Sequence, residues 1–236
     1  MKAPPTPTRA TYHHGDLRRT LLDTALKLIA ERGPEGFSLR EAAREVGVSP
    51  AAAYRHFADK PELIAALAAE GHGRLAGAME KAAARVDEPD PRARAVAAVA
   101  AIGRAYVEFA IRNPSFFSVM FGSHLHQAGY QPACAPSGRD SYQVLSAALD
   151  GLVASGAITP ERRTGAEIPA WSVVHGFSTL LVDGALPLGA HQRAEALRIL
   201  WRSVLLGLGC DPALVPPPPV RWKDPHPPHA GPGRAR

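Results

Sequence analysis

SLREAAREVGVSPAAAYRHF, residues 38–57, contains the start and stop signals of two short helices. Ser38, with a glutamate three residues later, is the pattern of a capping box, which opens a helix. Gly47 ends that helix because glycine adopts the left-handed backbone conformation at little cost. Ser49 and Pro50 then supply an N-cap and a first helical residue. Two helices joined by a short turn that contains glycine are typical of a helix-turn-helix unit.

The second helix of this unit begins with three alanines, residues 51–53. Small side chains there allow the backbone of a recognition helix to enter the major groove, where alanine methyls contact thymine methyls. Tyr54 and His56 are long enough to bond to the flanking phosphates. Ser38 and Lys60 begin helices on either side, and helix N-termini favour phosphate.

A second interpretation of the same residues stays open. In this interpretation the two helices only pack against each other at a corner of the fold and do not bind DNA. Tyr54 is then a half-buried packing residue with its hydroxyl in water. Arg40 lies one turn into the first helix and is a further candidate for a phosphate or base contact. The role of Arg55 stays open.

Hydrophobic periodicity on both sides of this unit predicts an all-α fold. Alanine and leucine dominate, and aromatic residues make up only 6% of the chain, which favours helix over strand. GSHLHQAGYQPACAPSG, residues 122–138, is expected to be a long irregular connection. We expect about nine helices, near residues 15–32, 38–46, 50–57, 60–85, 92–112, 114–121, 139–155, 164–186 and 191–208.

Composition changes along the chain predict its organisation. The turn cluster DEPDPR, residues 87–92, is the strongest candidate for a boundary between two functional parts. The proline-rich ends are not expected to pack. We therefore expect a flexible arm over residues 1–13, a helix-turn-helix domain over 14–62, a helical regulatory and dimerisation domain over 63–210, and a disordered tail over 211–236.

Charge and cysteine content restrict the cellular context. The formal net charge of +5 suits a polyanionic partner without establishing one. The two cysteines are too few for a disulfide framework, and no long apolar segment predicts a signal peptide or a membrane span. We expect a soluble, cytoplasmic protein without a cofactor. His124 and His126, with Cys134 nearby, are too weak a pattern to predict a metal.

The segment LLDTALKLIAERGPEGFSLREAAREVGVSPAAAYRHFADKPELIAAL, residues 21–67, resembles the N-terminal domain of the TetR/AcrR family of transcriptional regulators. The resemblance implies that Phe57 and Val48 belong to the core. It also implies that eight residues lie at the DNA surface: Ser38, Arg40, Ser49, Ala51, Ala52, Tyr54, His56 and Lys60.

The C-terminal part carries a second resemblance. IPAWSVVHGFSTLLVDGAL, residues 168–186, together with NPSFFSVMFG, residues 113–122, is similar to the Trp-His-Gly subgroup of C-terminal domains in the same family. The resemblance implies a homodimer in which the last two helices of each protomer pair. It also implies a palindromic DNA operator and a small-molecule effector that releases the protein from it.

An effector pocket between the C-terminal helices has several candidate residues. Trp171 and His175 lie four residues apart, hence on one helical face. A largely apolar pocket with a few polar groups suits a small molecule. The alternative is that all of these residues are ordinary core. The candidates are Phe109, Phe117, Met120, Phe121, Trp171 and His175.

Two other functions compete with a ligand-responsive repressor. One is a DNA-binding dimer that senses nothing. The other is an enzyme in which His175 is a general base oriented by Asp183 or Glu167. Asp183 lies about 12 Å from His175 along one helix, too far for a hydrogen-bonded pair. No catalytic motif offers a better site, so we expect no enzyme. The sequence does not identify the effector, the operator or the regulated genes, and it does not separate repressor from activator.

Overall fold

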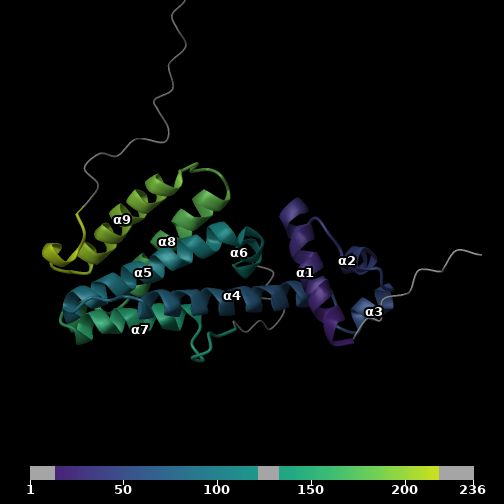
Figure 1. The fold of residues 1–236 in the computed structure, drawn as a ribbon, viewed down its shortest axis with the longest axis horizontal. Helices are drawn as coiled ribbons and strands as arrows, with labels where there is room; N and C mark the ends of the chain where they lie inside the picture. Colours follow the sequence, from purple (N-terminus) through teal and green to yellow (C-terminus); the bar gives the residue numbers. More distant parts are fainter. Residues whose placement is uncertain (1–13, 122–132, 218–236) are drawn as a thin grey trace, which may run out of the picture. The chain divides into compact units, whose positions relative to one another are not determined.

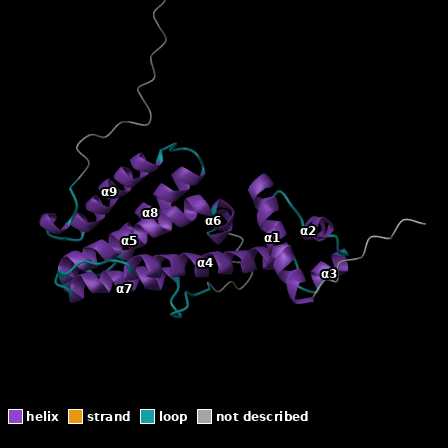
Figure 2. Ribbon diagram, in the orientation of Figure 1, coloured by secondary structure: helices purple, strands orange, loops and turns teal. Residues whose placement is uncertain are grey.

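The computed structural model describes residues 14–121 and 133–217 (Figure 1). Within these ranges the chain forms α-helices and short 3-10 turns and contains no strand (Figure 2), so the all-α prediction is confirmed. None of the described helices is long and apolar enough to cross a membrane. The helices are α1 His14–Arg32, α2 Leu39–Val46, α3 Pro50–Tyr54, α4 Lys60–Ala84, α5 Pro91–Arg112, α6 Pro114–Met120, α7 Ser141–Ala154, α8 Glu167–Val182 and α9 Ala190–Gly207, with 3-10 turns η2 Pro160–Arg162 and η3 Pro212–Leu214.

The chain divides into two compact units. The first unit falls within Met1–Glu70 and Ser115–Gln131, and the second within Gly71–Pro114 and Pro132–Arg236. The helix α4 therefore begins in the first unit and ends in the second.

The first unit is built around the packing of α1, α2 and α3 on one another. Phe57 is almost completely buried, as the sequence predicted, whereas Val48 is half-buried. Burying such aliphatic and aromatic side chains is the main force that holds short helices together, since helices of this length are marginal on their own. Other buried residues of this core are Leu21, Ala25, Ala42, Ala53, Leu63 and Leu67.

The second unit is organised around α5, which contacts α7, α8 and α9 (Figure 1). Gly103 on α5 is a point of close approach between α5 and α9, because a Cβ atom there would lie 1.9 Å from Cζ2 of Trp201 on α9. The absence of a side chain at Gly103 thus makes room for the buried indole. The buried face of α5 consists of Val96, Val99, Ile102, Gly103, Tyr106, Val107, Phe109 and Ala110.

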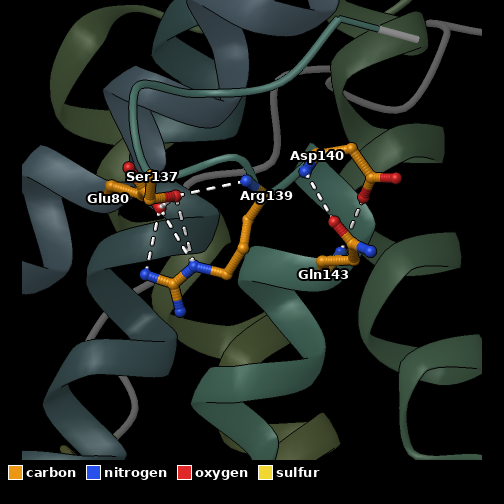
Figure 3. A network of polar contacts seen from close by, with 5 residues as sticks. All are labelled: Glu80, Ser137, Arg139, Asp140 and Gln143. Atoms are coloured by element: carbon orange, nitrogen blue, oxygen red, sulfur yellow. Dashed lines mark hydrogen bonds and ion pairs between the residues drawn. The ribbon is translucent and has the colours of Figure 1, made fainter.

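Residues 133–140 have no helical structure and lie against α4. A Cβ atom at Gly73 would lie 3.2 Å from the carbonyl oxygen of Cys134, so this glycine permits close packing. Figure 3 shows how the segment is held: Ser137 donates to the Glu80 carboxylate on α4, and Arg139 forms an ion pair with the same carboxylate at 3.0 Å.

A capping box at the start of α7 follows directly. Asp140 accepts a hydrogen bond from the Gln143 amide at 2.8 Å, and the Gln143 side chain accepts one from the Asp140 amide at 3.0 Å (Figure 3). These reciprocal bonds satisfy backbone donors that the first helical turn leaves unpaired.

The third helix is shorter than predicted. We expected it to reach Phe57, but α3 ends at Tyr54. The amides of His56 and Phe57 both bond to the carbonyl of Ala53, at 2.9 and 3.1 Å, which closes the helix in a turn. This turn places the Phe57 ring in the core, so burial of one aromatic side chain overrides helical continuation.

Candidate nucleic-acid interface and ligand cavity

The start of α2 is capped by Ser38, as the sequence predicted. Its Oγ accepts a hydrogen bond from the Glu41 amide at 3.2 Å. The Glu41 carboxylate forms an ion pair with Arg32 at 2.7 Å, and this pairing lowers the pKa of Glu41. The Ser38 hydroxyl keeps its own proton as a donor for another acceptor, since a hydroxyl both donates and accepts.

The turn between α2 and α3 has the expected geometry. Gly47 has φ 79°, in the left-handed region, and its amide bonds to the carbonyl of Arg44 at 3.0 Å. Ser49 then caps α3, because its Oγ accepts from the Ala52 amide at 3.3 Å. The helix-turn-helix geometry predicted from the sequence is therefore present in the first unit.

The three alanines of α3 have different environments. Ala53 is completely buried, whereas Ala51 is exposed and Ala52 is partly exposed. The outer face of α3 thus presents methyl groups at the two positions that the sequence predicted for DNA contact. Tyr54 adds a phenol at the end of the helix with 43% of its surface exposed.

The other residues predicted to contact DNA differ in exposure and in their neighbours. Arg40 is exposed and has no ion-pair partner among the described residues, so its guanidinium is available. Lys60 is partly exposed; its Nζ lies 3.5 Å from a Glu35 carboxylate oxygen and 5.1 Å from the centre of the Phe37 ring. His56 is half-buried in the turn after α3.

Two arginines of α1 are engaged within the first unit. Arg19 forms ion pairs with Asp23 at 2.6 Å and with Glu70 at 2.8 Å. The Arg18 guanidinium carbon lies 4.9 Å from the centre of the Phe57 ring, a cation–π contact. Both side chains are therefore held by contacts within the first unit.

The second unit contains an open groove and a more enclosed cavity next to each other. The groove has a volume of about 320 Å³ and is lined by Tyr142, Glu167, Ile168, Trp171, Ser172 and His175. The enclosed cavity has a volume of about 20 Å³ and is lined by Met79, Ile102, Gly103, Tyr106, Ser141, Tyr142, Leu145, Ala170, Trp171, Val174 and Trp201. Tyr142 and Trp171 belong to both.

A part-buried hydrogen-bond chain lies at this site. Oη of Tyr106 lies 2.9 Å from Nδ1 of His175. Burial raises the pKa of Tyr106, and a hydrogen bond from Trp171 opposes that rise. An indole N–H only donates, so Tyr106 accepts from Trp171 and its own proton points to His175. This arrangement assigns the proton of neutral His175 to Nε2.

The acidic groups near the groove are compensated by one arginine. The Arg163 guanidinium lies 2.8 Å from the Glu167 carboxylate and 2.7 Å from that of Asp150. Ser146 donates to Glu167 at 2.9 Å. The ion pair with Arg163 holds the pKa of Glu167 below its usual range, so this carboxylate is ionised near neutral pH.

The six predicted ligand residues do not gather at one place. Trp171 and His175 line the groove. Phe109, Phe117 and Met120 are buried, and these three and Phe121 line neither of the two cavities. These four residues therefore fit the alternative interpretation of the sequence, in which they belong to the hydrophobic core and not to a ligand pocket.

Sequence reasoning missed three residues of the site: Tyr106, Tyr142 and Trp201. An isolated glycine inside a helical pattern indicates a close approach. Gly103 was therefore an available signal for a bulky partner.

Metal binding gains no support from the described residues, which contain no group of three or more histidine, cysteine or acidic side chains that could hold an ion. His124 and His126 lie outside the described residues.

His175 gives the second unit an expected pH dependence. Burial lowers the pKa of His175, so between this pKa and the unfolded value of about 6.5 the unfolded chain binds a proton that the folded chain does not. Stability is therefore complete above about pH 6.5 and falls as the pH drops through the folded pKa. We expect His175→Asn, which keeps a hydrogen-bond acceptor but does not titrate, to reduce the loss of melting temperature between about pH 7.5 and 5.5.

The measurement is thermal unfolding of wild type and variant at each pH. His191→Asn is the matched control, because His191 is exposed on α9 and its contact with Glu195 is of the surface type that contributes little. Equal pH slopes in wild type and His175→Asn would contradict the role given to His175.

The capped α2, the glycine turn and the short α3 with an exposed outer face define a helix-turn-helix protein. Two family models match the chain: "Bacterial regulatory proteins, tetR family" over residues 21–67, and "Tetracyclin repressor-like, C-terminal domain" over residues 99–204. The chain belongs to the TetR family of transcriptional regulators. This is a family of regulators and not of enzymes, in agreement with the sequence prediction.

Known relatives support this assignment. An uncharacterised HTH-type transcriptional regulator of Haemophilus influenzae is 42% identical over 71 residues, which are 30% of this chain and 35% of that protein. The chain thus matches about a third of the length of this curated relative.

Solved structures share the fold over most of the chain. A protein of unknown function from Rhodococcus sp. RHA1 is 31% identical, with a TM-score of 0.65 over 84% of this chain and 98% of that one. The TetR family regulator PfmR from Thermus thermophilus is 24% identical, with a TM-score of 0.51 over 80% of this chain and 98% of that one. The second likeness concerns the fold alone.

Proposed function

We propose that this protein is a dimeric repressor that binds a palindromic operator through α2 and α3 and leaves it when a small molecule binds the second unit. The observation that carries the proposal is the outer face of α3. It exposes small methyl groups beside Tyr54, while the capping hydroxyls of Ser38 and Ser49 retain protons to donate. Such a face suits entry into the major groove with phosphate contacts at its rim.

The contacts divide by role. Ala51 and Ala52 pack against base edges, and Arg40 adds a base or phosphate contact. The two serines, Tyr54, His56 and Lys60 contact the backbone. With so few long side chains aimed at bases, DNA shape contributes to specificity.

Replacing Tyr54 by alanine tests the interface. We expect Tyr54→Ala to weaken operator binding about tenfold, because one phosphate hydrogen bond is lost, and to leave the fold intact since the side chain is exposed. Footprinting on genomic DNA supplies the operator, and fluorescence anisotropy over a salt series measures affinity.

The matched control is Tyr142→Ala, which removes a tyrosine of similar exposure, 46%, from the second unit. We expect it to leave operator affinity unchanged when no effector is present. Equal affinities for wild type and Tyr54→Ala would overturn the assignment of this face.

The dimer surface is proposed on α8 and α9. Exposed positions on α8 recur every four residues at Ile168, Ser172, Gly176 and Leu180, forming one stripe. Ile168 is 71% exposed and Leu180 48%, and a Cβ atom at Gly176 would meet nothing within 4 Å. Large apolar side chains beside small ones suit close packing against a second helix.

A charge on this stripe should weaken the dimer. We expect Leu180→Asp to raise the dimer dissociation constant at least tenfold, because each protomer loses an apolar contact worth about 1.5–3 kcal/mol and buries a charge. Sedimentation equilibrium measures the constant. Ala154→Asp, at an exposed position at the end of α7, should leave it unchanged. A dimer unaffected by Leu180→Asp would place the interface elsewhere.

The helix α4 offers a covalent route from ligand to DNA. It supplies Met79 to the wall of the enclosed cavity, and its first residue is Lys60. An effector that prefers a different position of α4 therefore changes the spacing of the two recognition helices and lowers operator affinity. The alternative is a DNA-binding dimer without an effector, and a ligand-induced rise in melting temperature separates the two.

The proposal extends to the subgroup of the C-terminal domain and to the cellular location. Trp171, His175 and Gly176 support the Trp-His-Gly subgroup for the C-terminal domain. We also place the protein in the cytoplasm, where a regulator of this family meets its DNA.

A further inference from the structure

Arg55, the residue directly after α3, has no structural role within the first unit. Its side chain is exposed, and its guanidinium has no hydrogen-bond or ion-pair partner among the described residues. The carboxylates nearest to it in the sequence are engaged elsewhere: Asp59 accepts from the Glu62 amide at 2.8 Å, and Glu62 accepts from the Ala58 amide. All N–H donors of this guanidinium are therefore available to a partner outside the unit.

The backbone places Arg55 at the centre of the outer face of α3. Its φ of −76° and ψ of −20° continue the helical conformation for one residue beyond Tyr54. At about 100° per residue, Arg55 and Ala51 each lie about 160° around the helix axis from Ala53, which is buried. Tyr54 and Ala52 fall on the two flanks, about 60° and about 100° from Ala51 in opposite directions. Arg55 and Ala51 thus form the strip of α3 that points furthest from the core.

The side chain of Arg55 starts towards the beginning of α3. The Cα–Cβ bonds of a helix tilt towards its N-terminus, so a helical side chain covers the turn that precedes it. For Arg55 this turn is at Ala51, whose side chain is a single methyl group and leaves room for a longer one. Recognition helices contact base edges with their N-terminal residues. The Arg55 side chain therefore starts in the direction of the bases when α3 lies in the major groove.

The strip and the flanks of α3 meet different parts of the DNA in this arrangement. The centre of an inserted helix face meets the base edges on the groove floor, whereas the flanks meet the sugar–phosphate walls. Tyr54 lies on a flank and suits a phosphate, as proposed above. Arg55 lies on the strip and suits a base.

A guanidinium discriminates between bases because it only donates hydrogen bonds. In the major groove, guanine presents two neighbouring acceptors, N7 and O6. Adenine and cytosine each present an amino donor there, and thymine presents one acceptor beside a methyl group. Two parallel N–H donors therefore fit guanine better than any other base.

We propose that Arg55 is a specificity-determining residue that donates two hydrogen bonds, to N7 and O6 of one guanine in each half of the operator. This inference rests on the proposed function, because it requires α3 to lie in the major groove. Alanine methyls select thymine by apolar contact, and Arg55 adds hydrogen-bonded recognition of a second kind of base.

The first test measures base preference and not affinity alone. Footprinting on genomic DNA supplies the operator, and each base pair is then replaced symmetrically in both halves. Fluorescence anisotropy measures the affinity of wild type and Arg55→Ala for every operator. We expect one G·C pair per half whose replacement by A·T weakens wild type about 10- to 100-fold and leaves Arg55→Ala unaffected. At all other positions the two proteins should have the same preferences.

The second test leaves the protein unchanged. Incorporating 7-deazaguanine at the same position replaces N7 by C–H and keeps the base pair. We expect wild type to lose about tenfold in affinity, since one acceptor per half is removed, and Arg55→Ala to bind both operators equally. Wild type that binds both operators equally would overturn the contact with guanine.

Arg44→Ala is the matched control. Arg44 is an exposed arginine of α2 in the same unit, and its nearest carboxylate oxygen, on Glu41, is 3.9 Å away. The control removes the same charge and should leave every base preference unchanged; loss of the same guanine preference would contradict the proposal. Arg55→Ala that weakens all operators equally, with a reduced salt dependence, would place Arg55 on a phosphate and overturn the proposal. Unchanged affinity for all operators would also overturn it.

The outcomes separate this inference from the proposed function. A chain that protects no specific site in footprinting would overturn both. Weaker operator binding by Tyr54→Ala, together with unchanged base preferences in Arg55→Ala, would leave the DNA interface standing and overturn the role of Arg55 alone.

Discussion

Ala51→Glu is expected to weaken operator binding at least 100-fold, about 2.7 kcal/mol, without unfolding the protein. Ala51 is exposed on the outer face of α3, which we propose enters the major groove. A glutamate there is too long for close approach and brings a negative charge towards the phosphates. Juxtaposed like charges cost several kcal/mol, and a dimer carries the substitution twice.

The fold should tolerate this change. Ala51 lies directly after Pro50, the first residue of α3, and the first turn contains no acidic residue. A carboxylate near a helix N-terminus is mildly favourable. Thermal unfolding followed by circular dichroism checks the fold, and fluorescence anisotropy at one fixed salt concentration measures operator affinity.

The control places the same charge change elsewhere in the first unit. Ala30 is exposed on α1, outside the helix-turn-helix. We expect Ala30→Glu to reduce affinity far less, through net charge alone. Retention of wild-type affinity by Ala51→Glu would show that α3 does not face DNA.

Gly103→Ala is expected to destabilise the protein by about 2 kcal/mol, through a steric clash in the second unit. The new Cβ atom would lie 1.9, 2.2 and 2.3 Å from Cζ2, Cε2 and Nε1 of Trp201, distances that real contacts do not show. The indole is buried, so it has to displace its neighbours. This cost exceeds the gain of about 1 kcal/mol that alanine brings to a helix interior.

Two further variants make the cause testable by denaturant unfolding. Gly151→Ala is the matched control, because a Cβ atom at Gly151 on α7 meets nothing within 4 Å; it should stabilise the protein by about 0.5–1 kcal/mol. In a Trp201→Phe background, Gly103→Ala should cost much less, since the smaller ring leaves room for the methyl group. Additive effects of the two substitutions would contradict a direct clash.

The helix-turn-helix was predictable because its signals are local. Ser38, Gly47 and Ser49 act through backbone bonds to residues within a few positions, and the structure has these bonds. The end of α3 was not predictable in this way. It depends on the Phe57 ring, whose place in the core is decided by packing against distant helices.

The cavity in the second unit could be predicted only in part. Trp171 and His175 share one face of one helix, so their pairing follows from helical periodicity. Tyr106 and Trp201 come from α5 and α9, and no local pattern indicates that they meet Tyr142. Phenylalanine and methionine side chains, such as Phe109, Phe117, Met120 and Phe121, are found both in ligand pockets and in hydrophobic cores. Their composition alone therefore does not distinguish the two.

The sequence by itself determined the all-α class, most helix boundaries and the membership of the TetR family, because caps, glycine turns and periodicity act over a few residues. The tertiary structure alone decided that α3 ends at Tyr54, and that Gly103 makes room for Trp201. It also showed that Nε1 of Trp201 is buried without a hydrogen-bond partner among the described residues. These features depend on which distant side chains compete for the same space, and that competition is resolved only when the helices pack.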